Sequence, residues 1–396
     1  MKQIGWRKGI GIAVVSLGAA LILAPRPSAH ALATPAQQIK RVETLEELGG
    51  ALFADRNLSF SRRQNCVSCH SPELAFTDPR QLGEVKGAVS RGGDGRSLGD
   101  RNAPTLAYAA LIPRFEFAAS GEANGGLFHD GRAAGLDEQA VGPITNPVEM
   151  GMPDRASVVA RVAENPSYVE AFSRLFGGGT LADVEKSYRA IGSAIAAFER
   201  TKPFLAFDSR YDRSLRGETE LSELEEAGRD LFFSDNANCT RCHLQSREPG
   251  TAEIFTNARY YNLGVPPNKG IRSLNGKGEG FVDRGLADNP AIKNADLAHG
   301  RYRVPTLRNV AITGPYMHNG VFQELRTAIA FHDRFKGQAG SQNPETNAPW
   351  DEPEVAVNLA HYELQGQPLT QEQIDALAAF LATLTDRRYE HLLGGP

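Results

Sequence analysis

The pentapeptide C-x-x-C-H occurs twice in this 396-residue chain, and it constrains the fold more than any other feature of the sequence. The residues are Cys66, Cys69 and His70 in the first copy and Cys239, Cys242 and His243 in the second. In this motif two thiols attach to the vinyl groups of a c-type haem, and the adjacent His becomes an axial ligand of the iron. The chain has no other cysteine, so the sequence predicts two covalently bound c-type haems.

The pattern C-x-x-C also occurs as a zinc half-site, a redox dithiol or a disulfide. A zinc site does not need a His directly after the second Cys, and a thioredoxin-like dithiol needs a βαβ context that this sequence lacks. Both pairs carry the trailing His, and a segment typical of an export signal precedes them. Haem attachment is therefore the use that fits all four cysteines.

The first 33 residues have the parts of a secretory signal peptide. Positive charge in residues 1–8 is followed by an apolar run over 10–24 and by Ala31-Leu32-Ala33, so we predict cleavage after Ala33. The alternative is an uncleaved anchor, but the apolar run is short for a bilayer. No later stretch is long and apolar enough to span a membrane. We therefore expect a periplasmic protein without a membrane span after processing, the setting in which c-type haem is attached.

The charge balance argues against one class of partner. The formal net charge of the chain is −4, and removal of residues 1–33 takes away four cations and no acid, which leaves −8. Haem propionates add further negative charge. An acidic surface argues against nucleic-acid binding and is compatible with a basic electron-donor protein.

The sequence around each haem motif is repeated. A segment with Leu at helical spacing precedes each motif, over residues 45–52 and 221–232, and the second begins with a capping box at Ser222. Downstream, RNAPTL at 101–106 corresponds to RVPTL at 303–307, and FHDG at 128–131 corresponds to MHNG at 317–320. A helical segment follows each of these, at 135–140 and 323–330. Two halves with the same order of landmarks imply two similar domains.

The fold class that we expect is mostly α-helical with long loops, because strand patterns are few. Apolar residues recur at intervals of four and three from Val184 to Phe198, which predicts a buried helix that ends before Lys202-Pro203. Thr370 is placed to cap a last helix. The predicted divisions are a signal peptide at 1–33, an N-terminal haem domain at 34–213 and a C-terminal haem domain at 214–396. Residues 204–217 would form the link, and 264–299 and 337–353 would form long loops.

The side chains available as a second axial ligand differ between the two irons. Fourteen residues after His318 comes His332, and fourteen residues after His129 comes Pro143. Imidazole can bind iron, whereas proline has no lone pair to offer. The other candidates are His129, His299, His318, His361, His391, Met150, Met152, Met317, a Tyr, or no side chain at all.

We therefore predict that His243 and His332 close the second haem, while the His70 haem keeps an open face. A closed haem moves electrons, and an open haem does chemistry on a bound small molecule. The alternative for His332 is an ordinary surface histidine, in which case Met317 is the next candidate ligand.

An acidic residue is predicted to lie over the open face. Residues 146–153 (NPVEMGMP) place Glu149 among apolar neighbours. Peroxide cleavage requires a group that removes a proton from one oxygen and returns it to the other, and a partly desolvated Glu suits this role. The alternative is a solvated loop carboxylate. Gln139 would add a hydrogen bond there, or would only cap a helix.

On these landmarks the chain resembles the bacterial dihaem cytochrome c peroxidase and MauG family along nearly its whole mature length. The matching stretches are 66–70, 101–105, 128–133, 146–151, 239–243, 305–310 and 315–320. The resemblance implies that the N-terminal haem binds peroxide, that Glu149 is its acid–base residue with Gln139 and Pro143 beside it, and that the C-terminal haem relays or stores electrons. It also implies a calcium ion held through oxygen atoms. The calcium ligands would be Asn102, Thr313 and Pro315.

Three positions depart from the family pattern. The peroxidases often carry a switchable His ligand in the stretch that is 92–96 here, and this chain has none, so we expect a first haem that is open without reductive activation, as in MauG. The position over the second haem holds Met in peroxidases and Tyr in MauG, but His332 here, which lowers haem potential relative to Met. Both groups usually carry Trp between the haems, where this chain has His129. Electrons would then pass by His129, another aromatic residue or the propionates.

The leading expectation is an oxidoreductase that reduces hydrogen peroxide at the His70 haem. Its electrons would come through the His243 haem from a small cytochrome c or a copper protein. The first alternative is a MauG-like oxidase that uses peroxide to modify side chains of a protein partner. The second alternative is a non-catalytic dihaem electron carrier in which both irons are six-coordinate.

Overall fold

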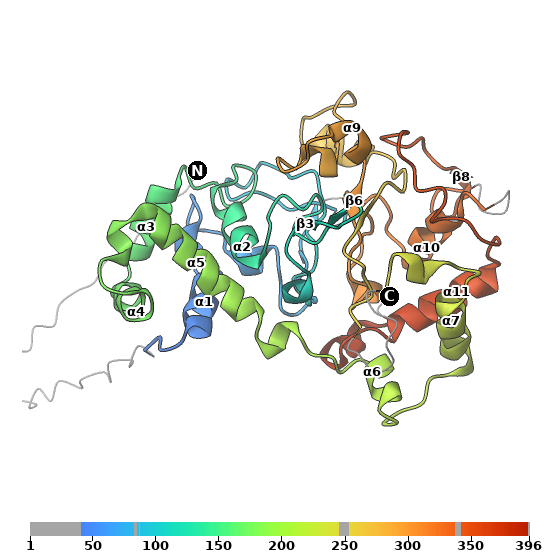
Figure 1. Cartoon of the computed structure of the whole chain (residues 1–396), viewed down its shortest axis with the longest axis horizontal. Helices are drawn as coiled ribbons and strands as arrows, with labels where there is room; N and C mark the ends of the chain where they lie inside the picture. The colour runs from blue at the N-terminus through green and yellow to red at the C-terminus, as the bar shows by residue number, and fades with distance from the viewer. Residues whose placement is uncertain (1–40, 83–84, 87, 245–252, 337–341, 395–396) are drawn as a thin grey trace, which may run out of the picture. The chain divides into compact units, whose positions relative to one another are not determined.

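The computed structural model describes residues 41–82, 85–86, 88–244, 253–336 and 342–394 (Figure 1). From Val42 onward the chain forms one compact unit. The predicted signal peptide at 1–33 lies outside the described residues. Within the described part of the chain, no helix has the length and apolar character needed to cross a bilayer.

In the part of the chain that the structure describes, the first half of this unit contains five α-helices. They are α1 (Leu45–Phe53), α2 (Leu136–Thr145), α3 (Arg155–Ala163), α4 (Pro166–Phe176) and α5 (Val184–Glu199). A capping box at Thr44 begins α1, and the side chain of Asp183 caps α5. The predicted helix from Val184 to Phe198 is thus confirmed. In Figure 1, α5 runs alongside α1, and together they form the centre of the larger apolar core.

The second half contains six α-helices within the residues that the structure describes. They are α6 (Arg210–Leu215), α7 (Glu223–Phe233), α8 (Lys269–Leu274), α9 (Ala295–Ala298), α10 (Leu325–Asp333) and α11 (Gln371–Ala382). The predicted capping residues Ser222 and Thr370 begin α7 and α11, each in a full capping box. In Figure 1, α11 packs beside α7.

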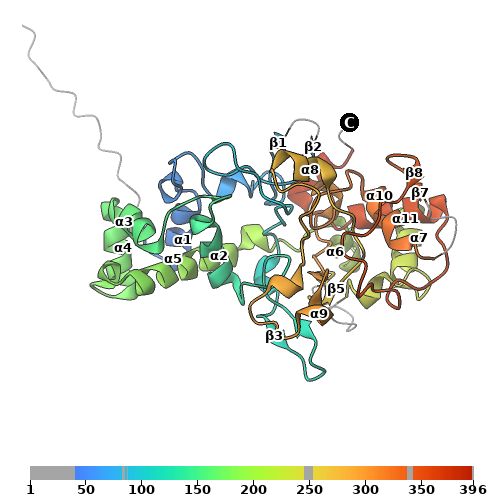
Figure 2. The same ribbon diagram turned by 90° about the horizontal axis from the view of Figure 1, so that it is seen from above.

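The strands are short and all pair antiparallel. Among the described residues the pairs are β1 (Gln81–Leu82) with β2 (Val85–Lys86), β3 (Glu116–Phe117) with β4 (Ala123–Asn124), β5 (Tyr260–Tyr261) with β6 (Tyr302–Arg303), and β7 (Gln342–Asn343) with β8 (Ala348–Pro349). In Figure 2, α8 lies beside β1 and β2, and Ile271 of α8 packs against Ala88 and Val89. The fold is therefore mostly helical with long connections, as expected.

The internal repeat is visible in the helix packing. Gly49 of α1 lies against the carbonyl of Ala194 in α5, and Gly228 of α7 lies against the carbonyl of Ala376 in α11. A Cβ on either glycine would collide with that carbonyl, so both crossings require glycine. This match sets the register between the halves, in which residues 189–199 of α5 correspond to residues 371–381 of α11, 182 positions later.

Segments predicted as links or loops hold more structure than the sequence suggested. The stretch 204–217 contains α6, and Asp212 of α6 forms a buried ion pair with Arg308. The stretch 264–299 contains α8 and α9, and 337–353 contains the β7–β8 pair, although 337–341 lies outside the described residues. The predicted boundary after residue 213 falls within α6 and remains a prediction.

Candidate haem sites

The first haem motif forms a tight turn that presents its His inward. Residues Cys66–Ser68 form a 3-10 turn, which the side chain of Asn65 caps at Ser68. Nδ1 of His70 donates to the carbonyl of Phe76 at 2.9 Å. Burial lowers the pKa of His70, so the ring is neutral and Nε2 keeps its lone pair. A neutral imidazole held through Nδ1 is prepared to bind a metal through Nε2.

The second haem motif repeats this arrangement. Residues Cys239–Arg241 form a 3-10 turn, and Nδ1 of His243 donates to the carbonyl of Phe255 at 3.0 Å. Burial, followed by the nearby His332, lowers the pKa of His243 to about 4. Each half therefore orients its motif His with one backbone carbonyl.

The structure brings the four residues predicted for the second haem to one cavity. A cavity of about 300 Å³ is lined by Cys239, Cys242, His243 and His332. His332 lies in the last turn of α10, and its Nδ1 donates to the carbonyl of Ala328 at 2.7 Å, which leaves Nε2 for a ligand. None of the four cysteines, all of them among the described residues, forms a disulfide. These residues fit a covalently attached haem, with two imidazoles that could serve as its ligands. Met317, the alternative ligand, lines the same cavity.

The matching position in the first half offers no ligand. Pro143 lies in the last turns of α2, as His332 does in α10. Gln139 lies one turn before Pro143 and is half-buried, and its side chain makes no hydrogen bond to another described residue. Residues 91–97 include no His, Met or Cys. Gly93 lies close to Gln64, and its amide donates to the carbonyl of Glu149 at 2.5 Å, so this loop packs over the site.

Glu149 lies in a turn next to the first haem motif. Nδ2 of Asn146 donates to Glu149 Oε2 at 2.7 Å. Burial raises the pKa of Glu149, while the bond from Asn146 and the charge of Arg132 oppose the rise. The negative charge of Glu149 in turn contributes to the raised pKa values of Cys66 and Cys69, which places the carboxylate near the attachment point of the haem.

Aromatic and imidazole rings line the cavity where it approaches the first half. Tyr302 stacks on His318 with 3.6 Å between ring centroids and 11° between ring planes. His318 lies edge-on to His129 at 6.5 Å. All three residues line the cavity, and so does Thr77, the neighbour of Phe76, whose carbonyl holds His70. Burial lowers the pKa of His129 to about 4 and that of His318 to about 3, so both rings are neutral.

A buried ion-pair network supports this group of rings. Arg101 binds Asp283 with two bonds of 2.7 Å and Asp130 with one of 2.6 Å. The hydroxyl of Tyr302 donates to the backbone carbonyl of Asp283 at 3.0 Å. Sequence reasoning missed Arg101, Asp283 and Tyr302 as part of the site. The one signal in the sequence was that Arg101 and Tyr302 each lie three residues before the proline of a repeated Pro-Thr-Leu.

The residues predicted to hold calcium are found in the wall of this cavity. Asn102, Thr313 and Pro315 all line the cavity. The carbonyl of Asn102 accepts a hydrogen bond from His129 Nε2 at 3.0 Å. Among the described residues no cluster of three or more His, Cys, Asp or Glu is placed to hold a metal. Calcium at this place would depend on neutral oxygen ligands, so it stays a proposal.

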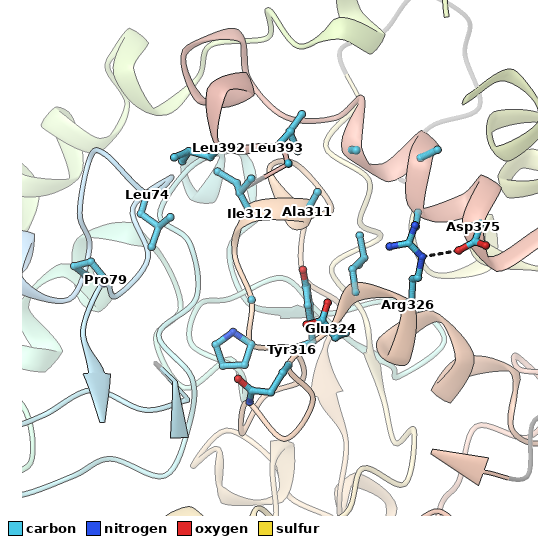
Figure 3. A pocket seen from close by; sticks show the side chains of 18 of the residues that line it. Leu74, Pro79, Ala311, Ile312, Tyr316, Glu324, Arg326, Asp375, Leu392 and Leu393 are labelled. Atoms are coloured by element: carbon cyan, nitrogen blue, oxygen red, sulfur yellow. Dashed lines mark hydrogen bonds and ion pairs between the residues drawn. The ribbon is translucent and has the colours of Figure 1, made fainter. Parts of the chain in front are cut away.

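A second cavity, of about 590 Å³, lies outside both haem sites (Figure 3). Leu74 and Pro79, which follow the first haem motif, form one side, and Ile312, Leu392 and Leu393 lie opposite in Figure 3. The ion pair of Arg326 with Asp375 stands at its edge. No Cys or His lines this cavity, so it offers nothing to attach or ligate a haem.

The fold and the two sites define a c-type oxidoreductase with two haems. The family described as "Di-haem cytochrome c peroxidase" matches residues 43–220. The methylamine utilization protein MauG of Paracoccus denitrificans is 50% identical over 377 residues, which cover 94% of this chain and 95% of that protein. The cytochrome c551 peroxidase of Nitrosomonas europaea is 30% identical over 81% of this chain and 82% of its own length.

Solved structures agree with this assignment. The diheme peroxidase BthA of Burkholderia thailandensis has a TM-score of 0.75 and 32% identity over 87% of this chain and 86% of its own. The chain therefore belongs to the dihaem cytochrome c peroxidase and MauG family, and it is an enzyme with two c-type haems.

Proposed function

We propose that this protein is a periplasmic peroxidase that reduces hydrogen peroxide at the His70 haem. Its electrons would arrive from a small cytochrome c or copper protein through the His243 haem. The family provides the cofactors and the class of reaction. The observation that carries the proposal is the difference between the halves. His332 lines the second haem cavity, whereas the first half has Pro143 at the matching helix position and the half-buried Glu149 near its haem motif.

Haem iron supplies the site at which peroxide binds and the electrons that reduce it. The chain itself has to transfer protons to and from the peroxide, and we assign this role to Glu149. An ionised Glu149 accepts a proton from one peroxide oxygen and then returns it to the other, which leaves as water. Asn146 holds one carboxylate oxygen at 2.7 Å and so fixes the direction of the other.

The stack of Tyr302 on His318 supports an aromatic path between the two halves, in place of the usual Trp. The Tyr302 hydroxyl donates to the backbone carbonyl of Asp283. Burial, followed by the charge of the Asp283 carboxylate, raises the pKa of Tyr302. We infer that the stack carries electrons between the haems.

A steady-state assay with hydrogen peroxide and reduced donor cytochrome tests the proposal. Peroxide-dependent oxidation of the cytochrome is expected without a preceding reduction step, because residues 92–96 offer no ligand that would have to leave the first iron. Negligible turnover with several donors, by a protein that contains both haems, would refute the peroxidase assignment.

The second candidate is an oxidase that uses the same site to modify a protein partner. The observation that favours it is the 50% identity to MauG over nearly the whole chain. The replacement of the usual inter-haem Trp by His129 argues against it, because an oxidising equivalent cannot be shared between the haems through an indole here. Peroxide-dependent modification of a protein, with negligible oxidation of donor cytochromes, would favour this candidate over the peroxidase.

A further inference from the structure

Arg303 of β6 differs in its partners from three other arginines of the interior, Arg101, Arg272 and Arg308. Arg101 is bound by Asp130 and Asp283, and Arg308 is bound by Asp212 with bonds of 2.6 and 2.9 Å. A fourth arginine, Arg272, pairs with Asp100 and Glu354. Each of these three guanidinium groups has at least one carboxylate partner, as a charge removed from water requires.

The guanidinium of Arg303 has only weak contacts to backbone oxygens. Its Nε lies 3.4 Å from the carbonyl of Phe128, and its Nη1 lies 3.3 Å from the carbonyl of Val304. Among the described residues it has no carboxylate partner, and Nη2 makes no hydrogen bond to them. Burial lowers the pKa of Arg303, as expected for a cation without a counter-charge.

Arg303 also lines the cavity that holds Cys239, Cys242, His243 and His332. The side chain is half-buried when only protein atoms are considered. A haem that fills the cavity would take away the remaining contact with water, and it would bring two carboxylate groups, its propionates. Guanidinium and carboxylate pair through two parallel hydrogen bonds, and Nη1 and Nη2 are the atoms left for such a pair.

The backbone around Arg303 joins the two halves. Its amide donates to the carbonyl of His129 at 2.8 Å, and its Nε faces the neighbouring Phe128. We propose that Arg303 binds a propionate of the second haem and thereby holds that haem against the loop of the first half that carries His129. The inference depends on the family's haems, but it does not depend on the proposed peroxidase activity.

A positive charge next to the second haem has a measurable consequence. The oxidised haem carries one positive charge more than the reduced haem, so a nearby cation disfavours oxidation. Loss of Arg303 should therefore lower the reduction potential of the His243 haem more than that of the His70 haem. Loss of its hydrogen bonds should also shift the propionate bending bands in the resonance Raman spectrum.

The test compares Arg303→Met and Arg303→Lys with the wild-type protein that carries both haems. Arg259→Met is the matched control, because Arg259 lies just before β5, the partner strand of β6, is exposed and pairs with Glu122. We expect Arg303→Met to lower the potential of the His243 haem and to shift its propionate bands. Arg303→Lys should retain more of the potential but still shift the bands, and Arg259→Met should change neither.

Unchanged bands and unchanged potential in an Arg303→Met protein with two attached haems would overturn the proposal. If that variant does not mature, the Lys variant decides the matter. Bands identical to wild type in Arg303→Lys would show that the guanidinium is not the propionate partner, and shifted bands would support the pairing. Neither readout requires peroxide or turnover.

Discussion

The two halves of this protein share a frame and differ at a few positions within it. Each half packs a glycine of one helix against a helix carbonyl, at Gly49 and Gly228. Each also fixes its haem-motif His through a hydrogen bond to the carbonyl of a phenylalanine, Phe76 or Phe255. In the first half Pro143 stands where the second half has His332, and the half-buried Glu149 lies near the first haem motif. On the proposed assignment, a duplicated scaffold fixes haem attachment, while single substitutions assign chemistry to one iron and electron transfer to the other.

The helix register gives a further pair to compare. Glu199 at the end of α5 corresponds to Leu381 of α11. Both are buried, but Glu199 has a carboxylate oxygen without a hydrogen-bond partner among the described residues. Burial raises the pKa of Glu199 to about 8. The first half therefore keeps a buried carboxyl that is neutral at moderate pH, where the second half has ordinary core.

Replacing the acid over the first haem should have the largest effect. We expect Glu149→Gln to slow peroxide cleavage by roughly 10²–10⁴-fold, the usual contribution of a positioned acid–base group. Stopped-flow mixing with peroxide measures the rate while the haem spectra show that both haems are attached. The control is Glu138→Gln, an exposed α2 residue paired with Arg114, which should be close to wild type. Equal rates for Glu149→Gln and wild type would remove Glu149 from the mechanism.

The pH dependence of peroxide cleavage should also reflect the Glu149 carboxylate. Because burial raises the pKa of Glu149, the ionised form needed to accept a proton is lost at a higher pH than for an ordinary glutamate. The rate of peroxide cleavage should therefore fall as the pH drops through an inflection above the usual pKa of a Glu. This inflection should be absent from Glu149→Gln. A wild-type profile that is flat down to the ordinary range would contradict the assignment.

The buried carboxyl at Glu199 should make stability depend on pH. With a folded pKa of about 8, the native state holds a proton that the unfolded chain loses at a lower pH. The free energy of unfolding should therefore fall as the pH rises from the ordinary Glu pKa through about 8. Glu199→Gln should remove this fall and gain on the order of a few kcal/mol over wild type at alkaline pH, since one pKa unit is about 1.4 kcal/mol.

Unfolding curves of the two proteins, both with two haems attached, at pH values below and above this range measure the difference. A constant difference between Glu199→Gln and wild type across the range would show that Glu199 does not titrate there. Glu199→Leu, which copies the second half, should follow the Gln variant in its pH dependence.

Removing the ring of Tyr302 from its stack on His318 should have the smallest effect of these changes, and the effect should be on electron transfer between the haems. Tyr302→Leu removes the ring that stacks on His318 and should slow electron transfer between the haems several-fold, because the aromatic path is interrupted. Tyr302→Phe keeps the ring and should stay near wild type. Transient absorption after flash reduction measures the rate, and Phe117→Leu, an exposed ring in β3, is the control. The aromatic path would be wrong if Tyr302→Leu transferred electrons as fast as wild type.

Much of the frame could be predicted because its signals are local. The capping boxes at Ser222 and Thr370 and the apolar spacing of α5 and α11 are written in short segments of sequence. The fourteen-residue spacing that placed His332 and Pro143 in matching helices is likewise local to each half. The assignment of Glu149 and His332 to their roles remains a prediction.

The cavity lining that joins the two halves could not be predicted, because it depends on contacts between segments that are distant in the sequence. Arg101 and Asp283 are 182 residues apart, and the pairing of β5 with β6 is what carries Tyr302 and Arg303 to the cavity. Arg303 in particular was visible only as the first residue of a repeated stretch. That its guanidinium lacks a carboxylate partner becomes evident only when the positions of the surrounding carboxylates are known.

Resting-state electron paramagnetic resonance of the protein as isolated tests most directly the proposed difference between the two irons, one open and one closed by two imidazoles. We predict one high-spin ferric signal from the His70 haem and one low-spin signal, typical of two imidazole ligands, from the His243 haem, in equal amounts. In His332→Ala the low-spin signal should be lost, while the original high-spin signal remains. Two low-spin signals in the wild-type protein would contradict the account, because a protein side chain would then occupy the iron that we assign to peroxide.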